Sequence, residues 1–521
     1  MRASKLLLAV LGYVATAAAA AGADGLRLAD ALRLALAQNP ALQVEQAQAA
    51  QAHGLALQAE GSFDTLLDGG ADYTRELSVP PFGPPAGKRV LGTGYQLGAA
   101  RQLRSGVRLS AGLDAAAYQD SALRADQQQG GTARLGVTLA LPLLRGRGAG
   151  EVAAGEDSAR LAAQAARALL RHRAAQVLQD TLAAYWRYSI RLALLEVASS
   201  SAERAGSLLD STRKLVAASQ RPRADLVLLE ADLADKTGAR QAAELAVAEA
   251  RHALGLLMGL DGAASAALGR PLDTLPAVAE LAPVAPAGLA QQALARRDDV
   301  QALAAQVAGA ERLLQGARGQ LRPRLDLELG ASYARVTAGA SHYGFLSDPA
   351  RHPDGPSLGA RLRYEFPLRN SAAQGAYLAR AAELASLQAR QKGLGQEVGS
   401  GVEFALQALA SSAAQLRVAQ RAMGLYEQAV RQEMVKQANG IATLIDVINV
   451  EGRFVNARTS LLNTQLAYAG ALARLRFETG TLLPAGAAPE RFELDAGELA
   501  SLGPLAPQLA APQNPSPPPP P

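Results

Sequence analysis

The sequence of 521 residues contains no cysteine. That absence excludes a disulfide scaffold, a zinc or iron–sulfur site held by cysteine, a thiol nucleophile and a lipid-modified N-terminal cysteine. Histidine is also scarce, since only 5 histidines are scattered along the chain, and this argues against a metal centre built from histidine. No other constellation of catalytic side chains stands out. We therefore expect a protein that is not an enzyme and that holds no metal and no cofactor.

Aromatic residues make up only 4% of the chain, although 49% of its residues are hydrophobic, chiefly alanine and leucine. Alanine and leucine favour long helices, whereas the large aromatic side chains that fill thick globular cores are few. We therefore expect an extended protein rather than a string of globular domains. An excess of one charge is lacking too. The 52 basic residues are interspersed with 47 acidic ones, which leaves no basic patch for nucleic acid.

The first residues have the pattern of a secretory signal peptide. Arg2 and Lys5 precede an uncharged, largely apolar run over residues 6–21, and small residues follow at positions 21–23. We expect cleavage before Asp24. A short membrane anchor is the weaker alternative, because the run is shorter than the roughly 20 apolar residues of a spanning helix. No later run reaches that length, so any insertion of the mature chain into a membrane must use strands.

The two halves of the sequence repeat each other in order, which indicates an internal duplication. Three segments align between the halves: Ala35–Gln43 with Ala293–Gln301, Gly70–Arg75 with Gly330–Arg335, and Leu141–Leu143 with Phe366–Leu368. Five further positions recur at one constant offset of 221 residues: Asp225, Glu230, Leu245, Leu254 and Gly259 correspond to Asp446, Glu451, Leu466, Leu475 and Gly480. Each half therefore reads as two short helices, strands, a very long helix, a turn and a returning helix.

The predicted strands alternate between apolar and polar residues, as in Ser357–Pro367. One face of such a sheet is apolar and the other charged, so the apolar face meets either lipid in an outer membrane or a second layer of a soluble protein. The few strands of one chain cannot close a barrel, and an open edge is not tolerated in lipid, so copies of the chain must pool their strands. Gly- and Pro-rich segments, Val79–Gly94 and Ala338–Pro356, are the expected exposed connections.

Two segments with coiled-coil periods, Gly150–Ala218 and Ser371–Ala438, predict helices roughly 100 Å long. Because both are charged, they must project into an aqueous compartment. The returning helices, Asp225–Gly259 and Asp446–Gly480, give only roughly 50 Å each. The short helices have the right length to stack end to end with them and complete a second rod; they are predicted at Pro40–Gly61 and Asp298–Gly319.

This order predicts nine segments. They are a signal peptide (1–23), short helices (24–62), barrel strands (63–148) and a helical hairpin (149–260) of the first repeat, a connecting equatorial segment (261–285), short helices (286–320), strands (321–369) and a helical hairpin (370–482) of the second repeat, and a Pro-rich tail (483–521). The glycines of residues 146–150 lack the Lys-Ser/Thr of a phosphate loop and are interpreted as the bend from strand into helix.

These features resemble the TolC-like outer-membrane efflux protein family over residues 26–482. The resemblance is carried by Leu36–Pro40, by the strand ends around Pro142 and Pro367, and by the segment Gly440–Val447 followed by a regular helix to Gly480. It implies a mainly α fold with a membrane β-barrel: a homotrimer whose twelve-stranded barrel in outer-membrane lipid continues as a twelve-helix coiled-coil tunnel in the periplasm.

The resemblance also implies a function and partners. The trimer would be the exit duct of a tripartite efflux or type I secretion system in a Gram-negative bacterium, docked through a periplasmic adaptor (membrane fusion) protein onto an inner-membrane pump of the RND, ABC or similar class. A periplasm-spanning coiled-coil scaffold or adhesin stalk is the alternative, but it would need neither a lumen nor alternating strands. The sequence does not identify the substrate or the pump.

In the family, the turns between the long and returning helices form a periplasmic mouth that opens like an iris. By motif position, Asp225 matches an aspartate of the closing network and Asp446 an acidic ring across the pore. Both also stand at a helix start, where a carboxylate is favoured by the helix dipole. The second ring position is occupied by Asn449. The partner positions of Asp225 are Gln437 and Ala442, and the basic role could pass to Arg221 or Arg223. Ser219 stands in place of a family glycine in the first tip, and Gly440 keeps that glycine in the second.

One strand-like stretch, Tyr95–Tyr118, has no counterpart in the second half. Either the barrel has more than four strands per chain, or this hairpin extends beyond the membrane. The sequence leaves both alternatives open.

Overall fold

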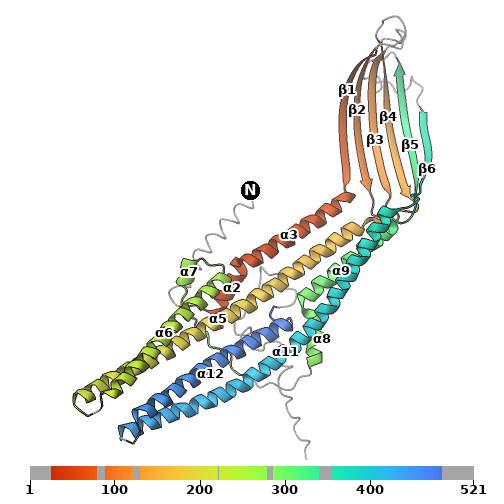
Figure 1. Cartoon of the computed structure of the whole chain (residues 1–521). Coiled ribbons are helices and arrows are strands. Elements are labelled where there is room, and N and C mark those ends of the chain that lie inside the picture. The colour runs from red at the N-terminus through yellow and green to blue at the C-terminus, as the bar shows by residue number, and fades with distance from the viewer. Residues whose placement is uncertain are drawn as a thin grey trace, which may run out of the picture. The chain divides into compact units, whose positions relative to one another are not determined.

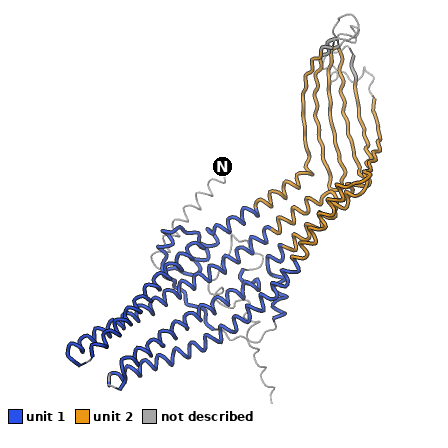
Figure 2. Tube along the Cα trace, in the orientation of Figure 1, with its two compact units in different colours: residues 1–49, 166–302, 391–521 blue, residues 50–165, 303–390 orange. Residues whose placement is uncertain are grey.

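The computed structural model describes residues 25–78, 88–120, 129–220, 222–278, 286–338, 355–439 and 441–483. The predicted signal peptide, almost all of the predicted Pro-rich tail, Arg221 and Gly440 lie outside the described residues. The chain forms two compact units (Figure 2). Unit 1 comprises Met1–Ala49, Ala166–Ala302 and Gln391–Pro521, and unit 2 comprises Ala50–Ala165 and Leu303–Arg390. The division of the sequence into nine segments therefore remains a prediction.

Unit 2 contains one antiparallel sheet of six strands in the order β1-β2-β3-β4-β5-β6 (Figure 1). Its strands are β1 (Thr65–Ser78), β2 (Lys88–Gln102), β3 (Arg108–Asp120), β4 (Gln129–Pro142), β5 (Arg324–Ala338) and β6 (Gly355–Glu365). Each strand pairs with its neighbour in sequence, and β4 pairs with β5 across the boundary between the repeats. The alternating segments predicted from the sequence therefore do form one continuous sheet.

The unmatched stretch of the first half forms the end of β2, a tight turn and β3. The turn closes through hydrogen bonds from Leu103 N to Val107 O and from Gly106 N to Leu103 O, both 2.8 Å. Gly106 has a φ of 94°, a left-handed conformation that glycine adopts without steric cost. The sheet thus has more than four strands per chain, and the twelve-stranded barrel implied by the resemblance does not match three copies of this sheet.

The loop predicted at Val79–Gly94 was too long. Lys88–Gly94 belong to β2 and pair with β1, for example Gly94 with Asp72. Glycines at positions 92 and 94 resemble loop composition, but a Cβ at either would lie close to a polar side chain of β1, Thr74 or Asp72. These glycines therefore serve a close approach between strands.

Side chains alternate between the two faces of the sheet. One face carries large apolar side chains that are exposed on the chain: Leu67, Leu97, Leu109, Leu113, Leu135, Val137, Leu329, Tyr333, Leu358 and Leu362. The opposite face carries mostly polar, charged and very small residues, with Leu66 of β1 and Tyr118 of β3 as larger exceptions. Three glycines, Gly98, Gly112 and Gly136, lie side by side there in successive strands.

Two helices have the predicted great length, α5 (Ala154–Ala217) and α11 (Ser371–Ala438). A short helix α4 (Ala149–Val152) precedes α5, so the segment predicted as one helix from Gly150 is interrupted at Ala153. The predicted bend before it is present, since Gly146 and Gly148 both have positive φ angles, 81° and 95°. None of the helices in the described part of the chain is both long and apolar enough to cross a membrane.

The returning helices are α6 (Ala224–Leu257) and α12 (Leu444–Glu478). Within unit 1 the helices lie side by side in the order α6, α5, α12, α11 (Figure 1). Leu178, Leu182 and Trp186 of α5 are buried between α6 and α12, while Val398, Val402 and Leu409 of α11 are buried against α12. The heptad-spaced seams predicted from the sequence are therefore the cores of this layer.

The short helices are α2 (Leu28–Gln38), α3 (Pro40–Glu60), α8 (Pro286–Arg296) and α9 (Asp298–Gly319). Asn39 joins the first pair to the returning helix: its Oδ1 accepts from Ala41 N at 2.9 Å, and its Nδ2 donates to Leu257 O at 2.8 Å. Gly259, just past the end of α6, has a φ of 73°, and a Cβ there would lie 2.4 Å from the Gln38 carbonyl oxygen. The predicted end-to-end arrangement of short and returning helices is confirmed at this junction.

Candidate functional site

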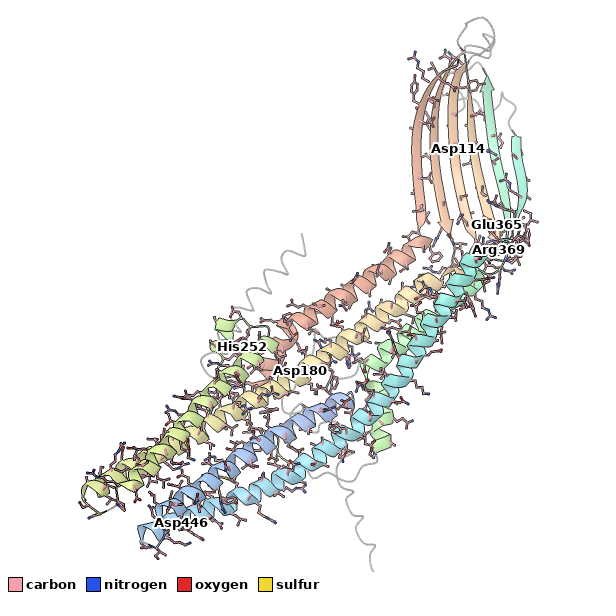
Figure 3. All side chains as sticks on the ribbon, viewed as in Figure 1. Asp114, Asp180, His252, Glu365, Arg369 and Asp446 are labelled. Carbon is pink, nitrogen blue, oxygen red and sulfur yellow. The ribbon has the colours of Figure 1, made fainter. Side chains whose placement is uncertain are left out.

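The second helical tip is built on a capping box at the start of α12. Asp446 accepts hydrogen bonds at Oδ2 from Thr443 N (2.9 Å) and Thr443 Oγ1 (2.6 Å), and Asp446 N donates to Thr443 Oγ1 (3.3 Å). The bond from the Thr443 hydroxyl, followed by the bond from its backbone N–H, lowers the pKa of Asp446. The carboxylate is exposed at the free end of the helix (Figure 3). Asp446 therefore caps a helix and also presents a stable negative charge at the tip.

One basic group that acts on this carboxylate was not singled out from the sequence. Lys436 in the last turn of α11 lies close enough for its charge to lower the pKa of Asp446 further. Lys436 itself pairs with Glu433 at 3.1 Å. The predicted basic residue Arg223 is exposed and has no ion pair among the residues that the structure describes. Lysine in a last helical turn is a known complement to the helix dipole, and that signal points to Lys436.

The first tip is a left-handed turn at the end of α5. Ser219 has a φ of 58° and is exposed. Its N–H donates to Val216 O at 2.9 Å, and Gln220 N donates to Leu215 O at 2.9 Å, which is the hydrogen-bond pattern of a Schellman cap. In the second tip Ile441 N donates to Lys436 O at 2.9 Å, the same bond 221 residues later. Ser219 therefore holds the conformation for which glycine is preferred.

The other predicted tip residues surround these two turns. Asp225 is the second residue of α6 and is half-buried. Asn449 is exposed, and it lies on the same face of α12 as Asp446 because three residues separate them. Gln437 and Ala442 are half-buried. The structure thus brings Thr443 and Lys436 to Asp446. Gln437, Ala442 and Arg223 were expected as partners of Asp225, and that expectation stays a prediction.

The two helical hairpins are joined just behind their tips. Leu209 of α5, Leu229 of α6 and Leu444 of α12 form a buried cluster. Beside it, Arg204 Nε of α5 donates to Glu451 Oε1 of α12 at 2.7 Å. The contacts that hold the tips in position are therefore apolar as well as ionic, and neither Arg204 nor Leu209 was predicted from the sequence.

A second charged cluster lies where α12 ends against α8 and α9. The buried side chain of Arg297 donates to Asp299 through Nη2 at 2.8 Å and to Glu478 through Nη1 at 2.5 Å. Burial opposes the ionisation of Asp299, but the hydrogen bonds and charge of Arg297 outweigh it, so the pKa of Asp299 is lowered. Arg297 occupies the position that aligns with Asn39 of the first repeat. Both residues fasten a returning helix to the short helices.

His172 of α5 packs beside this cluster. Its ring lies 5.4 Å from that of Phe477, and its Nδ1 lies 3.7 Å from Asp299 Oδ1. Burial lowers the pKa of His172, although the negative charge of Asp299 opposes this. The positive charges of Arg297 and Arg173 add to the lowering, and Glu478 acts against it. His172 is therefore a neutral side chain that resists protonation.

Exposed aromatic residues lie on the apolar face of the sheet. Tyr364 is near the end of β6, whereas Tyr73, Tyr95 and Tyr333 lie in the middle part of their strands, with Tyr333 in the same row as Leu135. The rows between Tyr333 and Tyr364 hold chiefly leucine, valine and alanine, together with Arg101. An outward-facing apolar band that carries aromatic residues is typical of transmembrane strands.

The polar face has a different character. Asp114 lies on β3 (Figure 3), opposite Arg134 on β4, and Arg134 Nη2 lies 3.2 Å from Ser332 Oγ on β5. Two residues along the strands from this pair, the glycine row of residues 98, 112 and 136 continues into Ser332 and Ser357. A shallow hollow of about 470 Å³ lies over this row. The face suits contact with water rather than with lipid.

Known proteins are similar to this chain in part of its sequence and in its fold. Residues 289–481 match the family described as outer membrane efflux protein. No curated protein sequence matches the chain significantly.

Among solved structures, the outer membrane protein VceC of Vibrio cholerae is similar with a TM-score of 0.64 and 16% identity, covering 87% of this chain and 96% of that chain. The Campylobacter jejuni CmeC outer membrane channel has a TM-score of 0.63 and 13% identity, covering 87% and 85%. The open state of the Neisseria gonorrhoeae MtrE outer membrane channel has a TM-score of 0.63 and 15% identity, covering 87% and 89%. At these identities the likeness concerns the fold. Residues 289–481 are therefore similar to the outer membrane efflux protein family, and the fold is similar to that of TolC-like outer-membrane channels.

Proposed function

We propose that the protein is the outer-membrane exit duct of a tripartite efflux or type I secretion system in a Gram-negative bacterium. The observation that carries this function is the sheet. Its exposed apolar face, which carries several aromatic residues, needs lipid to cover it, while its opposite face is largely polar. The family match of residues 289–481 to outer membrane efflux proteins supports the same location.

The working unit is a homotrimer. One six-stranded sheet has two open edges, and lipid does not accept unpaired backbone groups, so the chain must close its wall with further copies. The helices carry charge along their length and extend into the periplasm, where a periplasmic adaptor docks them onto an inner-membrane pump. The pump supplies energy and selects the substrate, which the duct then passes outward.

The helical tips form the narrow end of this duct. Asp446 supplies a ring of three carboxylates, with Asn449 one turn further along α12 and Asp225 at the start of α6. Three equal charges around a narrow lumen raise the local negative potential and attract cations. The turns that carry Ser219, Arg221, Arg223, Gln437, Gly440 and Ala442 are the surface offered to the adaptor.

A coiled-coil scaffold or adhesin stalk without a lumen is the rival function. It leaves the apolar face of the sheet unexplained, because a stalk in water would cover Leu67 and Leu358, which are 82% and 85% exposed. No described element of the chain covers that face.

Planar-bilayer recording of the purified mature protein tests the proposal. Discrete, long-lived conductance steps from folded, detergent-extracted protein are expected, with a native mass of three chains. Folded protein that inserts into lipid yet gives no conductance would overturn the duct and favour the stalk. Heat-unfolded protein from the same preparation is the control for detergent artefacts.

A further inference from the structure

We propose that the β2–β3 hairpin is part of the membrane wall and that each chain contributes all six strands to a barrel closed by pairing β1 of one copy with β6 of the next. Three copies of a six-stranded sheet make eighteen strands. This inference rests on the trimer of the proposed function. It goes beyond that function, because it assigns a different barrel from the twelve-stranded one that the family resemblance implies.

The first support is that the hairpin shares the apolar band of the other strands. Leu97 of β2 and Leu113 of β3 stand in one cross-strand row with Leu135 of β4 and Tyr333 of β5. All four are exposed, by 63%, 40%, 58% and 50%. A hairpin that projected beyond the membrane would not need apolar side chains at the level where its neighbours have them.

The second support is the state of the two edges. Among the residues that the structure describes, β1 pairs only with β2, and β6 pairs only with β5. Their outer N–H and C=O groups would be unsatisfied in lipid, which strongly disfavours an open edge there. Six is an even number, so β1 and β6 run in opposite directions. A second copy of the chain therefore offers the antiparallel edge that each of them lacks.

The third support comes from widths. With strands about 4.8 Å apart and tilted by about 40°, six strands occupy an arc of about 38 Å, whereas four occupy about 25 Å. The four helices α6, α5, α12 and α11 lie side by side, and at about 9 Å between axes they occupy about 36 Å. The six-stranded sheet of one chain is therefore about as wide as its layer of four helices.

A wider barrel follows directly. The diameter of a barrel grows roughly in proportion to its strand number, so eighteen strands give a diameter about 1.5 times that of twelve. The outer-membrane end of this duct is then not its narrowest part. A two-copy barrel of twelve strands, or a hairpin outside the membrane, are the competing arrangements.

Site-specific fluorescence quenching tests the place of the hairpin, and the absence of native cysteine makes it practicable. A bimane label is placed at Ala111→Cys, on the apolar face of β3, and at Ser110→Cys, on its polar face. Val137→Cys and Thr138→Cys on β4 are the matched controls. In proteoliposomes we expect brominated lipid to quench labels 111 and 137 equally, and aqueous iodide to quench 110 and 138. Quenching of label 137 but not of label 111 by brominated lipid would overturn the proposal.

Disulfide trapping tests the closure. Asp68→Cys on β1 is combined in turn with cysteine at each polar-face position of β6, namely residues 355, 357, 359, 361, 363 and 365, which covers the registers that β6 offers to Asp68. Ser110→Cys with Ser357→Cys is the control, because β3 lies inside the sheet. We expect one β1–β6 pair to give a ladder of covalent chains that ends at three. A ladder ending at two, or no ladder from any pair, would overturn the eighteen-stranded barrel; conductance that persists in those same preparations would leave the duct function standing.

Discussion

The guanidinium of Arg204 in α5 donates to the carboxylate of Glu451 in α12 at 2.7 Å, and this bond ties the two repeats of the chain together. Glu451 and Glu230 occupy equivalent positions of the duplication. Glu230 pairs with Arg213 of α5 inside its own hairpin, at 3.1 Å. At the same offset of 221 residues from Arg213 the second repeat has Met434, which carries no charge. Glu451 therefore has no partner in the equivalent place and pairs with the other hairpin instead.

Loss of this pair should loosen the tips. We expect Arg204→Gln and Glu451→Gln each to raise the fraction of time that the channel spends in its most conducting state about fivefold, because a partly buried ion pair of this kind contributes about 1 kcal/mol. Single-channel recording measures this fraction.

The double variant distinguishes a direct pair from separate effects. If the residues act on each other, Arg204→Gln combined with Glu451→Gln should open the channel no further than either change alone. Arg213→Gln, which breaks a pair inside one hairpin, should have little effect. Additive effects of the two changes would contradict the pairing.

Charge at the second tip should control ion selectivity. We expect Asp446→Asn to lower the cation preference of the channel while keeping an acceptor for the Thr443 N–H, and Asn449→Asp to raise it, because the added carboxylate lies on the same helix face. Reversal potentials in a KCl gradient measure both. Asp261→Asn is the control, since Asp261 caps α7 (Gly262–Ala266) through Ala264 N. Unchanged selectivity in both tip variants would place the constriction elsewhere.

The first tip should gain stability from glycine. Ser219 adopts a left-handed φ of 58°, which costs a residue with a Cβ about 1 kcal/mol relative to glycine. We expect Ser219→Gly to slow hydrogen exchange at the amides of residues 219 and 220 about fivefold. Ser211→Gly, inside α5, should speed exchange around it, because glycine destabilises a helix interior. Faster exchange at the tip in Ser219→Gly would contradict the assignment of the turn.

His172 should make the protein less stable in mild acid. Burial lowers its pKa below the ordinary value of about 6.5, so the unfolded chain binds a proton more readily than the folded one as the pH falls below that value. The stability from neutral His172 is therefore complete above about pH 6.5 and decreases below it. Asp299, whose pKa is lowered, stays ionised in this range.

Thermal unfolding of the solubilised protein at pH 7.5 and 5.5 measures the effect. We expect His172→Gln to reduce the difference between the two unfolding temperatures. His252→Gln changes an exposed histidine of α6 and should leave the difference as it is (Figure 3). An equal acid response in wild type and His172→Gln would remove His172 as its source.

Most helices and strands could be predicted from the periodicity of apolar residues in the sequence. Asp298–Gly319 and Ser371–Ala438 were predicted with the bounds that the structure gives them, because uninterrupted helical patterns between Pro and Gly leave little freedom in where a helix begins and ends. The strands were recognisable for the same reason, since alternation has a period of two. Glycine composition led to a wrong loop prediction at Lys88–Gly94, where the small residues allow neighbouring strands to approach closely and do not form a turn.

The candidate site was less accessible to sequence reasoning. Thr443 and Asp446 form a threonine-x-x-acid box that local pattern could have revealed. Arg204 and Glu451 are 247 positions apart, and nothing in either neighbourhood points to the other. Resemblance supplied Asp446 and Asp225 by position, and its basic partner for Asp225, Arg221 or Arg223, stays a prediction. It did not point to Lys436, whose charge acts on Asp446. This partner of Asp446 is set by the packing of α11 against α12, so it becomes apparent only in the folded chain.

A row of glycines crosses β2, β3 and β4, and Ser332 and Ser357 continue it. Almost no long side chains protrude from this belt of the sheet. A long, flexible cargo that slides past such a belt meets backbone, hydroxyls and water. It finds few apolar surfaces to adhere to and no bulky side chains to displace. In the closed wall this belt would act as a low-friction collar, where cargo is neither held nor sorted.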